Sequence, residues 1–130
     1  MFREGGCLCG AVRFIAEGAP VNVRACHCRL CQKALGAPFF ARALFEQRHL
    51  TVVGPTGAYA SSPALERVFC VKCGTTVFAR RTNDKFTGVA LATFDDRNAL
   101  APTEHTWVSE KVDWLKLDDG LPQHSEAAPH

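Results

Sequence analysis

The seven cysteines are the residues of this chain whose type and spacing most clearly indicate chemistry. They form a C-x-C, a C-x-C-x-x-C and a C-x-x-C, made by Cys7 and Cys9, by Cys26, Cys28 and Cys31, and by Cys70 and Cys73. Thiolates at such short spacings are typical of zinc sites, because several sulfurs can reach one ion. A disulfide framework is the alternative, and the odd cysteine count and close spacings disfavour it.

The first and third groups together can supply a closed zinc site with four sulfur ligands. Zinc takes about four ligands in a tetrahedron, and a C-x-x-C turn followed by Gly74 aims two sulfurs at one point. Two cysteines at spacing two lie on the same face of a strand, so they can supply the other half. We therefore expect a structural zinc that joins two distant segments of the chain. Its ligands would be Cys7, Cys9, Cys70 and Cys73.

The remaining three cysteines, Cys26, Cys28 and Cys31, can hold a second zinc whose fourth position stays open. An open position is typical of a reactive zinc, and three thiolates favour a soft fourth ligand such as an incoming thiol, held as its thiolate. His27 is an alternative fourth ligand, although in an extended segment its side chain points away from both neighbouring sulfurs. Two further alternatives are a metal-free trio and a single cluster in which all seven cysteines bind two bridged zinc ions.

Short strands dominate the elements that must position these groups. Alternating or β-branched and aromatic residues predict strands over 9–15, 21–25, 50–53, 65–69, 75–79 and 86–94. One short helix is predicted over 29–35, ended by Gly36, and a turn over 95–100. The last ten residues, 121–130, contain two prolines and little apolar content, and they predict a loose tail. The fold class is therefore mainly β with short helical turns.

Composition limits the classes of protein that fit. A chain of 130 residues with 47% hydrophobic and 22% charged residues fits one globular domain, which we place at residues 1–120. No apolar run reaches the roughly 18 residues of a membrane span, and the N-terminus lacks a secretory signal, so we expect a cytoplasmic protein. The short pair Arg80–Arg81 is too small a basic cluster to indicate nucleic acid. Nothing in the sequence indicates an oligomeric state.

Four segments carry a resemblance to a known family. They are GGCLCGAVRF at 5–14, CHCRLC at 26–31, FCVKCGTTVF at 69–78 and the segment 105–123. Together they resemble the glutathione-dependent formaldehyde-activating enzyme family, which includes the centromere protein V type proteins. The resemblance implies an Mss4-like β-tent fold stapled by zinc, with a structural zinc on the four cysteines above and a catalytic zinc on the trio. It also implies a carbon–sulfur lyase that joins glutathione to formaldehyde and forms S-(hydroxymethyl)glutathione.

Glutathione carries two carboxylates, so basic residues are expected near the trio. Arg29 and Lys33 are the predicted substrate-binding residues, with Lys111 as a more distant candidate. His105 is expected at the surface, with a proton shuttle as the alternative role.

Four aromatic residues close to the cysteine groups or near the C-terminus are candidates for the core or for a pocket wall. We expect both Phe39 and Phe40 in the core, although one of them could wall the open site. Trp107 and Trp114 are also expected to pack in the core, although one of them could line a pocket. The alternative functions are a non-catalytic, zinc-stabilised binding or scaffold module and a zinc reservoir or redox sensor.

Overall fold

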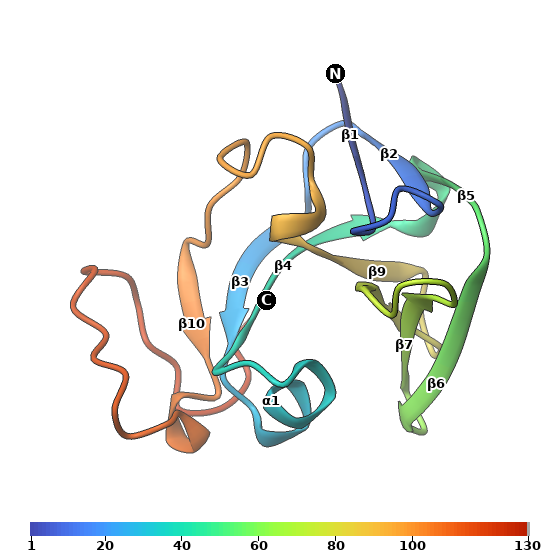
Figure 1. Cartoon of the computed structure of the whole chain (residues 1–130). Coiled ribbons are helices and arrows are strands. Elements are labelled where there is room, and N and C mark those ends of the chain that lie inside the picture. The colour runs from blue at the N-terminus through green and yellow to red at the C-terminus, as the bar shows by residue number, and fades with distance from the viewer. Residues whose placement is uncertain (130) are drawn as a thin grey trace.

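Two β-sheets make up most of the fold in the computed structural model, which describes residues 1–129 (Figure 1). The small sheet has the strand order β1-β2-β5, with β1 Phe2–Gly6, β2 Arg13–Glu17 and β5 Leu50–Val53. The large sheet has the order β10-β3-β4-β9-β8-β7-β6. Its strands are β3 Asn22–Cys26, β4 Phe40–Glu46, β6 Thr56–Ser62, β7 Leu65–Cys70, β8 Thr76–Arg81, β9 Phe86–Ala90 and β10 Glu104–Thr106. The prediction of a mainly β fold is confirmed.

The helices are short and lie at the ends of strands. They are α1 Arg29–Leu35 and the 3-10 turns η1 Gln47–His49, η2 Leu91–Thr93 and η3 Val108–Glu110. The predicted bounds of α1 are confirmed, because its ends are set locally: the Cys28 side chain caps the start and Gly36, with φ 60°, ends it in the left-handed region. No helix among residues 1–129 is long and apolar enough to cross a membrane.

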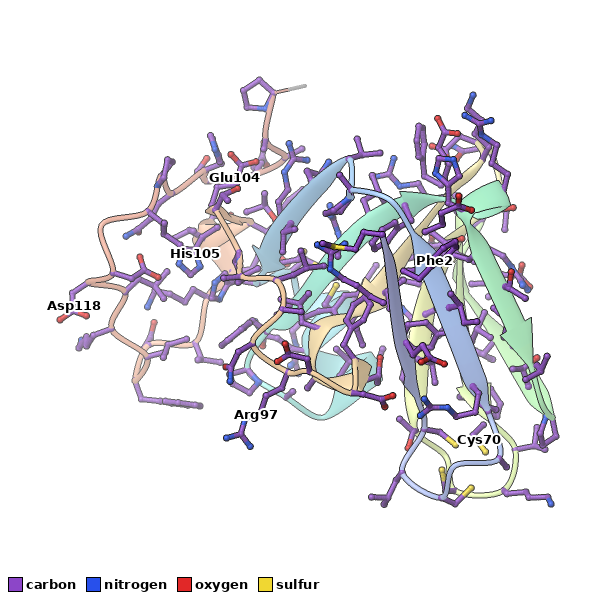
Figure 2. The ribbon with its side chains drawn as sticks, turned by 90° about the horizontal axis from the view of Figure 1, so that it is seen from above. Phe2, Cys70, Arg97, Glu104, His105 and Asp118 are labelled. Carbon is purple, nitrogen blue, oxygen red and sulfur yellow. The ribbon has the colours of Figure 1, made fainter. Side chains whose placement is uncertain are left out.

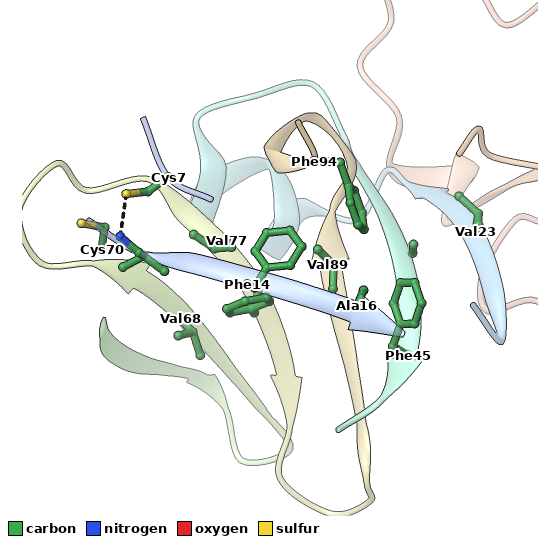
Figure 3. Packing of buried hydrophobic residues seen from close by; sticks show 13 residues of the cluster. Cys7, Phe14, Ala16, Val23, Phe45, Val68, Cys70, Val77, Val89 and Phe94 are labelled. Carbon is green, nitrogen blue, oxygen red and sulfur yellow. Dashed lines mark hydrogen bonds between the residues drawn. The ribbon is translucent and has the colours of Figure 1, made fainter. Parts of the chain in front are cut away.

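Phenylalanine rings fill the core between the two sheets (Figure 3). Phe14 on β2 packs edge-on against Phe78 on β8, with ring centroids 5.4 Å apart, and against Phe94, at 5.2 Å. Gly5 on β1 allows this packing, because a Cβ there would lie 2.3 Å from the Thr93 carbonyl oxygen and 2.5 Å from the Phe14 ring. The small sheet therefore covers one face of the large sheet.

The strand predictions differ from the structure in several places, and one is the segment predicted over 86–94, whose strand β9 ends at Ala90 before the turn η2. The segment predicted as one strand over 9–15 turns at Gly10, whose φ of 81° suits glycine, so the strand begins only at Arg13. Strands β1, β4, β6 and β10 were not predicted. In β4 and β6 the segments FARALFE and TGAYASS contain few β-branched residues. All four strands form because neighbouring strands pair with them, which local composition does not report.

The C-terminal strap, residues 121–129, was predicted to be loose, and in the structure it is hydrogen-bonded to β10 and η3. The amide of His105 donates to the Pro122 carbonyl at 2.9 Å, and that of Trp107 donates to the Glu126 carbonyl at 3.0 Å. The prolines are compatible with this pairing because they contribute carbonyl acceptors rather than N–H donors. His130, the last residue of the predicted tail, lies outside the described residues.

Candidate metal centres and the cavity beside them

The first and third cysteine groups come together at one end of the molecule, where sulfur atoms gather around Cys70 (Figure 2). The four sulfurs all lie within 4.8 Å of one another, with the Cys7 and Cys9 sulfurs 3.6 Å apart and the Cys9 and Cys70 sulfurs 3.8 Å apart. A tetrahedron with Zn–S bonds near 2.3 Å places its sulfurs about 3.8 Å apart. The donor set Cys7, Cys9, Cys70 and Cys73 therefore has the chemistry and the spacing of a closed zinc site.

Backbone amides and a hydroxyl surround these four sulfurs. The amide of Val12 donates to the Cys7 sulfur at 3.2 Å (Figure 3). Hydrogen bonds from the side chain and backbone of Thr75 lower the pKa of Cys73 to about 5. Donors around a sulfur stabilise its thiolate, which is the form that binds a metal. The Thr75 donors thus favour the thiolate form of Cys73, which is the form that a metal binds.

Cys26, Cys28 and Cys31 form the second group, with all three sulfurs within 4.8 Å of one another. Cys26 ends β3, Cys28 caps α1 and Cys31 lies in the first turn of α1, where its amide donates to the Cys28 sulfur at 3.3 Å. Hydrogen bonds from Cys28 and Cys31 lower the pKa of Cys26, while the proximity of Cys26 raises the pKa of both partners. Three such close thiols ionise together only when a cation replaces their protons. This donor set fits a zinc ion with three protein ligands.

His27 points away from the trio, as the sequence predicted. Its ring is fully buried, its Nε2 lies 2.9 Å from Nδ1 of His105, and it packs against Phe39 with ring centroids 5.1 Å apart. The expectation that His105 lies at the surface is wrong, because it is 5% exposed and its Nε2 lies 2.7 Å from Oδ2 of Asp119. Sequence reasoning missed this pair because 78 residues separate the two histidines.

A cavity of about 320 Å³ opens beside the trio, on the face of the large sheet opposite the phenylalanine core. Alternation within the strands explains this division, since Arg24 and Cys26 on β3 share one face and Val23 points to the core. The cavity is lined by the three cysteines, by four arginines, Arg24, Arg42, Arg67 and Arg81, and by Leu30, Phe40, Leu44, Leu65, Ala79, Gly88, Thr106, Trp107, Ala127 and Ala128. The cavity thus combines three sulfur ligands with an unusually basic wall.

The predicted substrate residues Arg29 and Lys33 do not line this cavity. Each lies two positions from Cys31 on α1, which is about 200° around a helix, so both face away from the sulfurs. Lys111 lies apart as well, with its ammonium donating to the carbonyls of Val112 and Leu115. The four arginines of the cavity were missed, although each of the strands β3, β4, β7 and β8 contains at least one arginine.

The structure places the four aromatic side chains of the sequence analysis in different surroundings. Phe40 is buried and walls the cavity, while Phe39 packs on His27. Trp107 lines the cavity as well. The prediction that Trp114 packs in the core is wrong, because this side chain is 71% exposed.

Comparison with protein families decides what kind of protein this is. The model of the glutathione-dependent formaldehyde-activating enzyme family matches residues 2–110, which include both cysteine clusters. The chain belongs to this family. The matched region includes the three cysteines of the trio and the four arginines of the cavity, whereas the strap lies beyond it.

Individual relatives agree with this membership. An uncharacterized lyase of Schizosaccharomyces pombe is 35% identical over 101 residues, covering 71% of this chain and 74% of the relative. A Halomonas elongata protein, provisionally named a glutathione-dependent formaldehyde-activating enzyme, is 29% identical over 150 aligned positions, covering 100% of this chain and 95% of the relative. The chain also matches the crystal structure of a Rhodobacter sphaeroides protein, with a TM-score of 0.61 and 22% identity. The match covers 93% of this chain and 98% of the Rhodobacter chain, so the two share a fold.

Proposed function

We propose that this family member is a zinc-dependent carbon–sulfur lyase that joins glutathione to formaldehyde and forms S-(hydroxymethyl)glutathione. The observation that carries the proposal is the position of Cys26, Cys28 and Cys31 in the wall of a cavity large enough for a small molecule. Three ligands leave one coordination position available for a substrate. The four-cysteine cluster would hold a second, structural zinc, so that the protein binds two zinc ions per chain.

Zinc held by the trio would supply a position at which the substrate thiol is present as its thiolate at neutral pH. The Arg67 guanidinium donates from Nη2 to the Cys31 sulfur at 3.6 Å and offsets negative charge on the three thiolates. Phe40, Leu44 and Leu65 supply apolar walls of the cavity beside the sulfurs.

The reaction itself is an addition without redox change. The glutathione sulfur forms a bond to the formaldehyde carbon, the carbonyl π bond breaks, and the thiol proton is finally carried by the new hydroxyl group. Because this addition is easy in water, the protein would contribute mainly proximity and a thiolate at neutral pH. Thiols that must stay reduced for this role agree with a reducing compartment such as the cytoplasm, and no disulfide joins any of the seven cysteines, all within residues 1–129.

The test is the rate at which glutathione and formaldehyde exchange with their adduct, measured by NMR exchange spectroscopy with the zinc-loaded protein. The wild-type protein should raise this rate in proportion to its concentration. Cys28→Ser should remain folded, lose one of two zinc ions and lose the acceleration. Arg29→Gln, which changes a charge outside the cavity, serves as the matched control and should keep it.

Absence of acceleration by protein that holds two zinc ions would contradict the proposal and favour a non-catalytic binding module. The same conclusion would follow if Cys28→Ser kept full activity.

A further inference from the structure

Arg24 and Arg42 lie directly opposite each other in the antiparallel pairing of β3 with β4, and both line the cavity beside the trio. Two like charges directly opposite in a sheet destabilise it. The charge of Arg24 is neutralised within the chain, because its guanidinium is ion-paired with Glu104. The second positive charge of the pair therefore needs a separate explanation.

Arg42 has no carboxylate partner within 4.0 Å among residues 1–129. Its hydrogen-bond partner is the neutral amide oxygen of Asn22. Burial, together with the positive charges of Arg24 and Arg81, lowers the pKa of Arg42 to about 10, so the side chain is still protonated at neutral pH. The cavity thus contains a half-buried cation without an anion from residues 1–129.

Gly88 on β9 gives the Arg42 side chain its position. A Cβ at residue 88 would lie 2.9 Å from Cδ of Arg42, so any larger residue would displace the guanidinium. Since Gly88 itself lines the cavity, the Arg42 side chain extends along the cavity wall.

Arg67 on β7 is the second arginine of the cavity that lacks a carboxylate partner among the described residues. It is 5% exposed, and its Nε donates to the Ser61 hydroxyl at 3.2 Å. Its Nη1 is buried and has no hydrogen-bond partner in the part of the chain that the structure describes. A buried donor without an acceptor is unfavourable, so this atom also indicates a ligand.

We propose that Arg42 and Arg67 form a carboxylate-binding subsite that selects acidic thiols, and this proposal rests on the proposed function. A guanidinium binds a carboxylate through paired, charge-assisted hydrogen bonds. Glutathione has two carboxylates, and the cavity has two arginines without a carboxylate of their own. With the substrate sulfur at the trio, its carboxylates lie against these arginines. Arg24 and Arg81 are ion-paired with Glu104 and Asp84 and contribute positive potential only.

The test measures binding rather than turnover, by calorimetry of the zinc-loaded protein with S-methylglutathione. This thioether keeps both carboxylates and has no thiol that could add to formaldehyde. Arg42→Gln should weaken its binding roughly ten- to hundred-fold, the range expected for hydrogen bonds between charged groups. Arg80→Gln, on the same sheet but outside the cavity, is the matched control and should leave binding unchanged.

The diethyl ester of S-methylglutathione tests the same subsite without changing the protein. It should bind wild type at least as weakly as the acid binds Arg42→Gln, because it lacks both carboxylates, and Arg42→Gln should not weaken binding of the ester further. Gly88→Ala keeps every charge and displaces Arg42, so it should also weaken binding of the acid. Equal affinity of wild type for acid and ester, or unchanged binding of the acid to folded Arg42→Gln, would overturn the subsite.

Arg67→Gln supplies the second arm, with zinc content measured because Arg67 contacts a trio sulfur. In protein with full zinc content, Arg67→Gln should weaken binding of S-methylglutathione as Arg42→Gln does. Undiminished binding would overturn the role of Arg67. The outcomes separate the two proposals. Arginine-dependent binding without acceleration of adduct formation would support the subsite and contradict the reaction. Acceleration with no preference for acid over ester would support the reaction and overturn the subsite.

Discussion

Nε2 of His27 and Nδ1 of His105 lie 2.9 Å apart in the interior, and His105 passes the chain of hydrogen bonds on to Asp119. The Asp119 carboxylate is an acceptor, so Nε2 of His105 carries a proton and donates to it. Nδ1 of His105 then accepts a hydrogen bond from Nε2–H of His27. Nδ1 of His27 is then a bare acceptor, which agrees with its lack of a hydrogen-bond partner among residues 1–129. The chain of three residues ties the loop of the trio to β10 and to the segment that leads into the strap.

His105→Ala should lower the free energy of unfolding by about 1–3 kcal/mol, because it leaves the buried His27 N–H without an acceptor. Chemical denaturation of the zinc-loaded protein measures this change. His49→Ala is the control, since His49 lies on η1 away from this chain of hydrogen bonds, and its change should stay within about 0.5 kcal/mol. Equal stability of the two variants would show that the histidine pair contributes little.

The pH dependence of stability should report on His27. Burial, and then the charge of His105, lower the pKa of His27 below its ordinary value of 6.5. Below about pH 6.5, His27 is therefore protonated in the unfolded chain but still neutral in the folded chain. The free energy of unfolding falls as the pH drops through this range. Chemical denaturation at pH values from 7.5 to 5.5 should show that the free energy of unfolding falls more steeply for wild type than for His27→Gln. The difference in slope should be at most about 1.4 kcal/mol per pH unit. Parallel curves would contradict this prediction.

The two cysteine clusters should differ in their effect on stability. Binding of a structural zinc is worth about 10 kcal/mol or more, which is comparable to the whole stability of a domain. Cys70→Ser should therefore abolish folding, because Cys70 is fully buried and its cluster joins the turn after β1 to β7. Cys28→Ser should keep the native circular dichroism spectrum and lose one zinc in metal analysis. Unfolding of Cys28→Ser to the same extent would contradict the division into a structural and a reactive site.

Deletion of residues 121–130 should lower the free energy of unfolding by about 1–3 kcal/mol, because the backbone hydrogen bonds to β10 and η3 are lost. It should also speed alkylation of the trio, since Ala127 and Ala128 line the cavity. Deletion of 128–130 alone is the control, because it keeps the hydrogen bonds made by residues 122–126 and should affect alkylation more than stability. A loose tail would leave both measurements unchanged.

Removal of an aromatic ring from the core should be costly at Phe45. This side chain is fully buried between the sheets, near Phe94, with ring centroids 6.4 Å apart. Phe45→Ala should lower the free energy of unfolding by about 3–5 kcal/mol. Phe2→Ala is the control, since Phe2 is 68% exposed, and it should change stability by less than about 0.5 kcal/mol. Similar effects of the two substitutions would contradict the assigned core.

The sequence by itself determined the features that depend on neighbours in the chain. Spacing was sufficient to divide the cysteines into three local groups, because thiols two or three residues apart on one turn can reach the same ion. The bounds of α1 were also predictable, since a capping side chain at Cys28 and a left-handed residue at Gly36 act within one helical turn.

Only the tertiary structure decided what surrounds the trio. The pairing of β3 with β4 places Arg24 opposite Arg42, and a shift of one residue would turn Arg42 to the core face. The contact of His27 with His105 and the strap along β10 likewise join segments far apart in the sequence. Such contacts depend on strand register and on packing across the whole chain, which the periodicity of a single segment does not encode. The grouping of the cysteines was therefore predictable, and the arginines beside them were not.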